Sequence, residues 1–303
     1  MLNSPPIFKS GFVAVVGRPN VGKSTLINTF LATKVAAVSP WPQTTRRRQI
    51  GILTREDAQI IFIDTPGVHK PLHKLGEQMN ASATHALEEC DQVLFLVDAS
   101  QPPSEDDQRL INLLKRLKRP GSVFLVVNKI DLVTKDDQPI QQQAWQELLP
   151  EAIALSISAQ RGDNLEQLLG MIIDRLPVGP PFFPTEQLTD LQEREIVADL
   201  IHEAALDHLR AEVPHSLAVR IDEYIERAEE GAYISATLFV ERDSQKGIII
   251  GQGGSMLKKI GSAARKEIET MNGRKVYLNL RVKVRKNWRD DDAALQSFGF
   301  NGE

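Results

Sequence analysis

The sequence predicts an α/β protein with a mostly parallel sheet, followed by a smaller α+β domain. In the first part of the chain, apolar runs typical of buried strands alternate with helical stretches, as in βαβ units with both sheet faces covered. A proline-rich segment follows, and beyond it the pattern changes to helices and half-buried strands. With 303 residues, 42% of them hydrophobic, the chain is long enough for two packed domains.

Four apolar runs predict strands of the first domain. They are GFVAVVG (11–17), QIIFIDTPG (59–67), QVLFLVDAS (92–100) and SVFLVVNK (122–129). The stretches STLINTFLAT and DQRLINLLKRLK between them have the apolar spacing of helices. This domain is expected to span residues 1–176.

The segment LPVGPPFFPTEQLT (176–189) contains four prolines. Proline fixes φ and lacks an amide donor, so we expect a stiff, extended linker over residues 177–189. The second domain should then span 190–303.

The second domain has an α-β-β-α-β pattern, with room for another short helix. DLQEREIVADLIHEAALDHLR and SMLKKIGSAARKEIETM have helical spacing, and SLAVRIDEYIE and AYISATLFVE are typical of strands. KVYLNLRVKVRK alternates strictly, which predicts a strand with one apolar and one polar face.

Charge is distributed unevenly, although the net charge is only −4. Residues 186–241 hold 4 basic and 14 acidic residues, whereas residues 242–289 hold 13 basic and 3 acidic ones. This basic block is either a solvated face or the binding surface for a polyanion.

The other composition features exclude several classes of protein. The single cysteine, Cys90, allows no internal disulfide, fits a reducing cytoplasm and is expected to be structural in a helix. The start of the chain lacks the apolar core of a signal peptide, and no run approaches the roughly 20 apolar residues of a membrane span. Six scattered histidines predict no metal site.

The segment GRPNVGKS (17–24) matches G-x-x-x-x-G-K-S between a strand and a helix, the context that a Walker A phosphate loop requires. Gly17 and Gly22 let backbone amides wrap phosphates, and the helix N-terminus adds partial positive charge. Lys23 is expected to reach the β- and γ-phosphates, and the Ser24 hydroxyl to ligate Mg²⁺.

Three further segments indicate that the nucleotide is guanine. In DTPG (64–67), Asp64 can hold Mg²⁺ through water and the Gly67 amide can contact the γ-phosphate. In NKID (128–131), the Asp131 carboxylate can accept two hydrogen bonds from guanine, and adenine would leave that carboxylate unpaired. SAQ (158–160) can offer an amide to the guanine oxygen.

Together these segments predict a P-loop GTPase. The residues expected to bind GTP are Gly17, Arg18, Pro19, Asn20, Val21, Gly22, Lys23, Ser24, Thr25, Asp64, Thr65, Pro66, Gly67, Asn128, Lys129, Asp131, Ser158, Ala159 and Gln160. Thr44 or Thr45, in QTTRRR, is expected to complete the Mg²⁺ shell. The three arginines that follow are either exposed to solvent or contact RNA or phosphate.

The phosphate loop, QTTRRR, DTPGVHKPLHKLGEQM, NKID, the proline-rich linker and a terminal glycine-loop domain together resemble the Era family, bacterial GTPases with a C-terminal KH domain. The resemblance covers nearly the whole chain. It implies a GTPase that uses GTP, GDP and Mg²⁺, binds the 3′ region of 16S ribosomal RNA, assists assembly of the 30S subunit, and associates peripherally with the inner membrane. The oligomeric state is left open, with a monomer as the simplest expectation.

The resemblance also implies catalytic detail. Ras-like enzymes orient the attacking water with a glutamine directly after the DxxG segment, where this chain has Val68. In related GTPases with such a substitution, an asparagine of the phosphate loop can ligate potassium, and Asn20 occupies that position. Thr45 matches the metal-binding threonine. The predicted catalytic set is therefore Lys23, Thr45, Gly67 and Asn20, with Ser24, Thr45 and Asp64 as metal ligands.

The second glycine loop, IIIGQGGSMLKKI, fits G-x-x-G and does not fit Walker A. A tight turn is one interpretation; the other is the loop with which KH domains clamp single-stranded RNA. The predicted RNA-binding residues are Lys246, Gly251, Gln252, Gly253, Gly254, Lys258, Lys259, Arg281, Lys283 and Arg285. The alternative to an RNA-binding assembly factor is a membrane-linked signalling GTPase whose KH-like domain binds protein.

Overall fold

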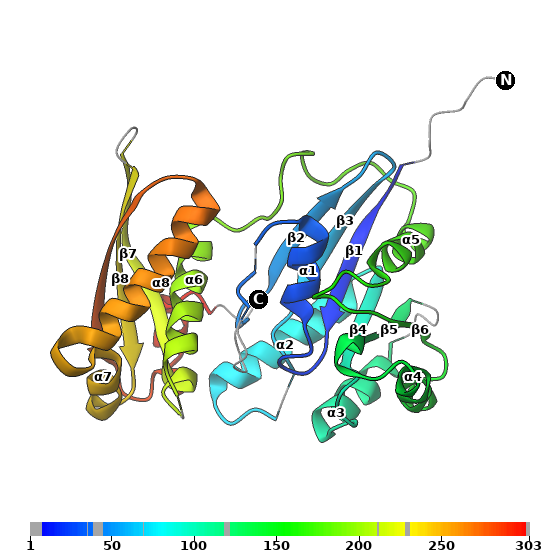
Figure 1. Ribbon diagram of the computed structural model, residues 1–303, viewed down its shortest axis with the longest axis horizontal. Coiled ribbons are helices and arrows are strands. Elements are labelled where there is room, and N and C mark those ends of the chain that lie inside the picture. Colours follow the sequence, from blue (N-terminus) through cyan, green and yellow to red (C-terminus); the bar gives the residue numbers. More distant parts are fainter. Residues whose placement is uncertain are drawn as a thin grey trace. The chain divides into compact units, whose positions relative to one another are not determined.

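The computed structural model describes residues 8–34, 36–38, 45–68, 70–117, 122–210, 212–227 and 231–300. The chain divides into two compact units, formed mainly by residues up to 190 and by residues from 191 onward (Figure 1). The predicted order of an α/β unit followed by a smaller α+β unit is confirmed.

The first unit is built on a six-stranded sheet in the order β2-β3-β1-β4-β5-β6. Strand β2 is antiparallel to β3, and the other neighbours are parallel. The strands are β1 (Lys9–Val16), β2 (Gln49–Thr54), β3 (Ala58–Asp64), β4 (Gln92–Asp98), β5 (Val123–Asn128) and β6 (Ile153–Ser156). The helices are α1 (Lys23–Leu31), α2 (Lys74–Glu89), α3 (Glu105–Leu114), α4 (Asp137–Leu148) and α5 (Leu165–Arg175).

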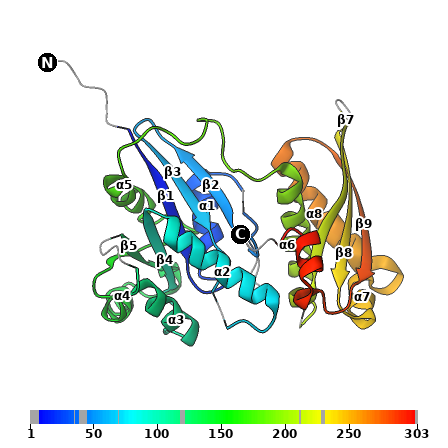
Figure 2. The ribbon, with the colours of Figure 1, turned by 180° about the vertical axis from the view of Figure 1, so that it is seen from behind.

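Two apolar cores cover the two faces of this sheet. Successive residues of a strand point to opposite faces, so Val13 of β1 packs with α1 and α5 while Ala14 packs with α2, α3 and α4. Figures 1 and 2 show these helices on the two sides of the sheet. The uninterrupted apolar runs of the sequence follow from this double coverage.

The parallel strands bring the predicted motifs to one edge of the sheet. The phosphate loop follows β1, DTPG begins at the last residue of β3, NKID begins at the last residue of β5, and SAQ lies just beyond β6. In open parallel sheets, ligands bind beyond the carboxyl ends of the strands. Segments more than 100 residues apart in the chain are thereby neighbours in space.

The proline-rich segment contains no helix or strand, as expected, but it is attached to the first unit. The Gly179 amide donates to Phe8, and the Ile52 amide of β2 donates to Leu188 at 2.8 Å. The buried Gln59 side chain accepts from the amides of Phe182 and Phe183 at 2.7 and 2.9 Å. The segment is therefore held against the first sheet and is not a free spacer.

The second unit combines three strands with helices in the order α-β-β-α-α-β-α. Its elements are α6 (Glu193–His208), β7 (Ala218–Arg227), β8 (Gly231–Val240), α7 (Asp243–Ile250), α8 (Ser255–Asn272), β9 (Val276–Val284) and α9 (Asp292–Ser297). The sequence left room for one more short helix, and the structure contains two, α7 and α9.

The second sheet has the order β7-β8-β9, with β7 antiparallel and β9 parallel to β8. Helices α6 and α8 pack on one face, where Ile234 and Val276 are buried. The alternation of β9 is confirmed, since Val276 and Val282 are buried while Tyr277, Arg281 and Lys283 are exposed.

Candidate functional site

The phosphate loop joins β1 to α1, and its conformation depends on glycine. Gly22 has φ +101°, and a Cβ there would overlap the Asn128 side chain. A Cβ on Gly17 would meet the Leu96 carbonyl oxygen at 2.5 Å. The Lys23 ammonium donates to the carbonyls of Gly17 and Arg18, each at 3.1 Å, so it is held inside the loop where phosphates are expected.

The Lys23 side chain is buried, with 6% of the residue exposed. Burial lowers the pKa of its ammonium to about 8, and the charge of Asp64 opposes this shift. Phosphate oxygens would favour the charged form and raise the pKa again.

We expect nucleotide binding to take up a proton at mildly alkaline pH. At pH 8.5 most Lys23 is neutral in the free protein, because its pKa is about 8, and bound phosphates recharge it. Isothermal titration of Mg·GDP in two buffers of different ionisation enthalpy should show more proton uptake at pH 8.5 than at pH 7. Equal uptake at both pH values would contradict a lowered pKa of Lys23 in the free protein.

Three oxygen-bearing side chains meet beside Lys23. Ser24 Oγ donates to Asp64 Oδ2 at 2.7 Å, Thr45 Oγ1 donates to the same oxygen at 3.2 Å, and the two hydroxyls are 3.0 Å apart. All three are hard oxygen donors, which suits Mg²⁺. The structure therefore brings the predicted metal ligands together; Thr44 lies outside the described residues.

The DTPG segment is fixed against the phosphate loop. Thr65 Oγ1 donates to the Val15 carbonyl at 2.8 Å. A Cβ on Gly67 would lie 2.7 Å from the Pro19 nitrogen, so only glycine allows this approach. Val68 packs against the apolar core, and its side chain has no group that could orient water.

Asn128 connects three loops of the site. Its Nδ2 donates to the Val21 carbonyl at 2.8 Å, and its Oδ1 accepts from the Ala159 amide at 2.9 Å. Thr29 Oγ1 of α1 lies 2.9 Å from the Ala159 carbonyl and supports the same loop. The base-binding and phosphate-binding loops are thus one hydrogen-bonded assembly.

Two carboxylates lie at the end of the site where the base is predicted to bind. Asp131 Oδ1 accepts from Ser158 Oγ at 2.6 Å, and Lys129 forms a 2.7 Å ion pair with Asp98. Burial disfavours the charged form of Asp98, but hydrogen bonds from Lys129 and Ser100 outweigh it and hold the pKa of this carboxyl below its usual value. Asp98 thereby fixes the Lys129 side chain.

Sequence reasoning missed Asp98 and Thr29. Asp98 ends β4 in QVLFLVDAS, and its place at the carboxyl edge of a central parallel strand was a usable signal. Thr29 gave none, because its partner Ala159 is far away in sequence.

Several predicted nucleotide-site residues have other side-chain contacts. The Arg18 side chain hydrogen-bonds Gln101 at 2.8 Å and lies 3.5 Å from the buried carboxylate of Asp107, so it points toward α3. Asn20 is exposed at the loop surface with φ +65°. Gln160 is exposed, whereas Pro19, Thr25 and Pro66 lie within the loops already described.

The three arginines after Thr45 do not form an exposed cluster. Arg46 is buried, and Arg48 pairs with Glu89 at 3.4 Å. Of the two interpretations of this run, full solvent exposure does not hold for Arg46.

The second glycine loop lies between α7 and α8. Gly251, Gly253 and Gly254 have φ of +70°, +59° and +80°, a region that favours glycine. A Cβ on Gly251 would meet Met256 at 2.8 Å, whereas Cβ atoms on the other two would point into open space.

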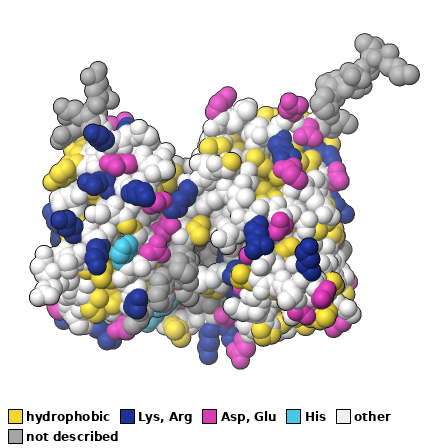
Figure 3. Space-filling view, viewed as in Figure 1, with side chains coloured by type: hydrophobic (Ala, Val, Ile, Leu, Met, Phe, Trp, Pro, Cys, Tyr) yellow, Lys and Arg dark blue, Asp and Glu magenta, His cyan; other side chains and the backbone are white. Residues whose placement is uncertain are grey.

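The surroundings of this loop suit an anion. Helix α8 begins at the loop, and its first turn contains no acidic residue, so its partial positive charge is uncompensated there. Lys258 and Lys259 are exposed on this turn, and Lys246 of α7 is half-buried. Figure 3, drawn from the side of α8, shows Lys and Arg side chains over this face of the second unit.

The structure does not bring Arg281, Lys283 and Arg285 to this loop. Arg281 and Lys283 lie on the sheet face that α8 does not cover. Arg285 pairs with Asp291 at 2.9 Å and lies over the Phe298 ring, so its guanidinium already has partners. The loop and the sheet face are two separate basic surfaces.

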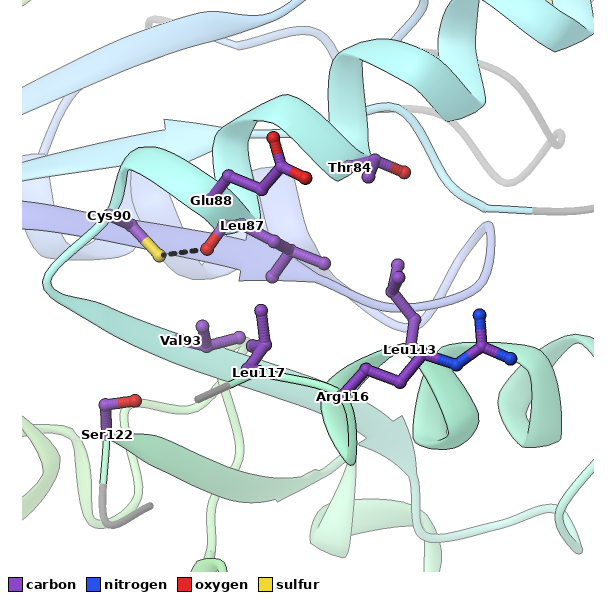
Figure 4. A pocket seen from close by; sticks show the side chains of 9 residues that line it. All are labelled: Thr84, Leu87, Glu88, Cys90, Val93, Leu113, Arg116, Leu117 and Ser122. Atoms are coloured by element: carbon purple, nitrogen blue, oxygen red, sulfur yellow. Dashed lines mark hydrogen bonds between the residues drawn. The ribbon is translucent and has the colours of Figure 1, made fainter. Parts of the chain in front are cut away.

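A cavity of about 420 Å³ lies between α2, α3 and β4 (Figure 4). Leu87, Val93 and Leu117 line it, and Cys90 lies one residue beyond the end of α2, with its thiol donating to the Leu87 carbonyl at 3.5 Å. The lining residues belong to neither predicted site. The described residues include no cluster of His, Cys, Asp and Glu that could hold a metal.

In the part of the chain that the structure describes, no helix has the length and apolarity needed to cross a membrane.

Comparison with known proteins agrees with this architecture. A family model described as 50S ribosome-binding GTPase matches residues 12–129, and a KH domain model matches residues 212–289. The chain is 48% identical over 299 residues to GTPase Era of Heliobacterium modesticaldum, covering 97% of each sequence.

Two solved structures are similar over 97% of this chain and 99% of theirs. One is Era in complex with MgGDPNP and nucleotides 1506–1542 of 16S ribosomal RNA, with 41% identity and a TM-score of 0.91. The other is a variant of Aquifex aeolicus Era with a single tyrosine-to-alanine substitution, bound to GDP·AlF4⁻, with 40% identity and a TM-score of 0.91. Identity and coverage at this level show that the chain belongs to the Era family of GTPases.

Proposed function

We propose that this GTPase binds the 3′ region of 16S ribosomal RNA with its second unit and assists assembly of the 30S subunit, under control of GTP and Mg²⁺ bound to its first unit. The observation that carries the proposal is that one chain combines a guanine-nucleotide site with a glycine loop on a basic surface. A relative that is 41% identical holds both MgGDPNP and a 16S ribosomal RNA segment. We assign residues 1–176 to the GTPase domain, 177–189 to the linker and 190–303 to the RNA-binding domain.

In this mechanism Lys23 contacts the β- and γ-phosphates, and the Gly67 amide contacts the γ-phosphate. Mg²⁺, held by Ser24 and Thr45 and through water by Asp64, would neutralise charge that develops on the phosphates. These residues position and stabilise the transferred group, and water must be oriented by something other than Val68. Intrinsic hydrolysis should therefore be slow.

We further propose that Asn20 ligates potassium and that this ion assists hydrolysis. Asn20 is exposed at the outer side of the phosphate loop, and Val68 packs into the core and leaves the catalytic position without a polar side chain.

Potassium should accelerate GTP hydrolysis relative to sodium at equal ionic strength, and Asn20→Ala should remove the difference. Phosphate release measured in both salts checks this, with nucleotide affinity of the variant as the control. Equal rates in the two salts for the unaltered protein would refute the Asn20 assignment.

On the RNA side, the glycine loop is proposed to clamp phosphates through backbone amides, as KH domains do for about four nucleotides. The left-handed glycines and the N-terminus of α8 support this, together with Lys246, Lys258 and Lys259. We also propose that Arg281 and Lys283 contact RNA on the other face of the sheet. Arg285 is the least favourable of the proposed RNA-binding residues, because its guanidinium already pairs with Asp291.

Crosslinking of RNA to the full chain in cells, followed by sequencing, tests the proposed function. Reads should concentrate at the 3′ end of 16S ribosomal RNA and fall for a Gly254→Asp variant that is present at the same level. Crosslinks to proteins or lipids without RNA would favour the membrane-linked signalling GTPase.

We also propose a cytoplasmic location with peripheral association to the inner membrane. The exposed lysines at the start of α8 would attract anionic headgroups as well as phosphates of RNA. Flotation with vesicles containing anionic lipid tests this, and absence of the protein from the vesicle fraction at low salt would refute it.

A further inference from the structure

Three apolar side chains lie in register across the second sheet, on the face that α6 and α8 do not cover. Ile225 of β7 pairs with Tyr233 of β8, and Tyr233 pairs with Tyr277 of β9. Their neighbours Ile234 and Leu278 pack with the core under the helices, so the pleat directs these three to the opposite face. We call Ile225, Tyr233 and Tyr277 the outer row; Figure 2 views this sheet from the side opposite to Figure 1.

The outer row is exposed at both ends, whereas Tyr233 in its middle is half-buried. Tyr277 is 69% exposed and Ile225 is 48% exposed. The rings of Tyr233 and Tyr277 are nearly parallel, with centroids 5.6 Å apart. Such a cross-strand pair stabilises the sheet. That role does not account for the exposed surface of the Tyr277 ring, and contiguous exposed apolar groups often mark interaction sites.

Positive charge accompanies the row along the edge strand β9. Lys275, Arg281 and Lys283 alternate with the inward residues and are exposed, Arg281 by 53% of its side chain. Among the described residues of this face, the acidic side chains Asp222 and Glu223 are on β7. The β9 side is therefore basic, whereas on the β7 side Arg220 offsets one of the two carboxylates.

The acidic side chain nearest to these cations is already neutralised. Asp222 pairs with Arg220 at 2.7 Å and accepts from Thr237. Burial opposes ionisation, but these contacts outweigh it and hold the pKa of Asp222 below its usual value. The Arg281 guanidinium lies 3.9 Å from the same carboxylate. The cluster of Arg220, Asp222 and Arg281 therefore contains two cations and one anion.

Exposed aromatic faces beside a row of cations match the chemistry of single-stranded RNA, in which bases stack on aromatic rings and phosphates contact basic side chains. We propose that the outer row, with Lys275 and Arg281, is a second contact surface for single-stranded RNA. A base stacks on the face of the Tyr277 ring that Tyr233 does not cover, and the backbone follows β9. The proposal rests on the proposed function and extends it to a surface separate from the glycine loop.

The two surfaces lie far apart within the second unit. Helix α8 has 18 residues, begins at the loop and ends at Asn272, shortly before Val276 opens β9. A helix of this length is about 27 Å long. A fragment of about four nucleotides that fills the loop cannot also reach Tyr277, whereas a longer segment can.

RNA binding by the full chain with RNAs of two lengths tests the proposal. The long probe is the 16S ribosomal RNA segment corresponding to nucleotides 1506–1542, and the short probe is a fragment of about four nucleotides that binds the loop. Tyr277→Ala should weaken binding of the long RNA about tenfold and leave the short one unchanged, because one stacked base is lost. Tyr277→Phe keeps the ring and should bind both as the unaltered protein does.

The outcomes separate the two proposals. If the unaltered protein binds neither RNA, the proposed function fails. If it binds both RNAs and Tyr277→Ala has no effect, only the second RNA-binding surface is refuted. The outer row would then have a structural or protein-binding role. Thermal melting checks each variant. Tyr277→Thr, with high strand propensity, replaces the alanine variant if that one does not fold.

Discussion

Asp131→Asn is expected to weaken GTP binding by about a hundredfold or more and to create binding of xanthosine triphosphate. In the proposed site the carboxylate would accept two hydrogen bonds from guanine, each worth roughly 1.5–3 kcal/mol because the acceptor is charged. Xanthine has a carbonyl where guanine has an amine, and the asparagine amide can donate to it. The Ser158 hydroxyl, 2.6 Å from Asp131 Oδ1, holds the side chain in place and can also donate, more weakly, to the amide oxygen of asparagine.

Affinities for GTP and xanthosine triphosphate, measured by competition with a fluorescent nucleotide, check this exchange. Asp136→Asn is the matched control, because Asp136 is exposed and its side chain does not cap α4. A variant at Asp131 that keeps full preference for GTP would remove this residue from the base site.

Gly254→Asp is expected to weaken RNA binding by roughly tenfold to a hundredfold, because a carboxylate beside phosphates places like charges together. Gly251→Asp is also expected to weaken RNA binding. Gly254 is nevertheless the better position for this test. A Cβ on Gly251 would collide with Met256 and threaten the fold, whereas one on Gly254 meets nothing within 4 Å.

Gly254→Asn is the matched control for the charge. Asparagine and aspartate have nearly the same size and both tolerate the left-handed conformation that φ +80° requires. Asparagine should therefore bind RNA much better than aspartate if the loop contacts phosphate. Equal affinity of both variants and the unaltered protein would make the loop a structural turn.

Lysines near the loop should behave differently from its glycines. Lys258→Ala or Lys259→Ala removes one counterion-releasing contact, so it should weaken binding to all sequences alike. The slope of log affinity against log salt should fall by up to about 0.7 for each lysine. GTP hydrolysis by the first unit should not change, and an unchanged salt slope would exclude these lysines from phosphate contact.

The motifs of the predicted nucleotide site lie together in the structure because each is local and the parallel sheet brings the strand ends to one edge. GRPNVGKS, DTPG, NKID and SAQ each follow the end of a strand, and such ends share one edge. Of the proposed metal ligands, Ser24 and Asp64 belong to these motifs, whereas Thr45 was chosen over Thr44 only through the family resemblance. Their hydroxyl and carboxylate oxygens lie within 3.2 Å of one another.

Contacts between side chains far apart in the chain were not predictable. Arg18 was assigned to the nucleotide, but its guanidinium has Gln101 and Asp107 as partners, and neither position carries a local signal for this. The proline-rich segment was expected to be a spacer, but the buried amide of Gln59 holds it through Phe182 and Phe183. Such contacts depend on which surfaces the fold brings together.

The strict alternation of β9 predicted two faces correctly but could not say which face adjoins the glycine loop. Arg281 and Lys283 were grouped with Lys258 by charge alone, and the structure separates them by the thickness of the sheet. The alternation in the sequence shows which residues of a strand share a face, whereas the position of α8 decides which of the two faces is covered.

Equilibrium binding of the full chain, loaded with Mg²⁺ and a non-hydrolysable GTP analogue, to the 3′ segment of 16S ribosomal RNA tests the central claim most directly. A scrambled RNA of the same length and composition serves as the competitor at physiological salt. We predict at least about tenfold preference for the 3′ segment, lost in Gly254→Asp and kept in Gly254→Asn. Equal affinity for both RNAs, or a preference that survives Gly254→Asp, would contradict recognition of ribosomal RNA through the glycine loop.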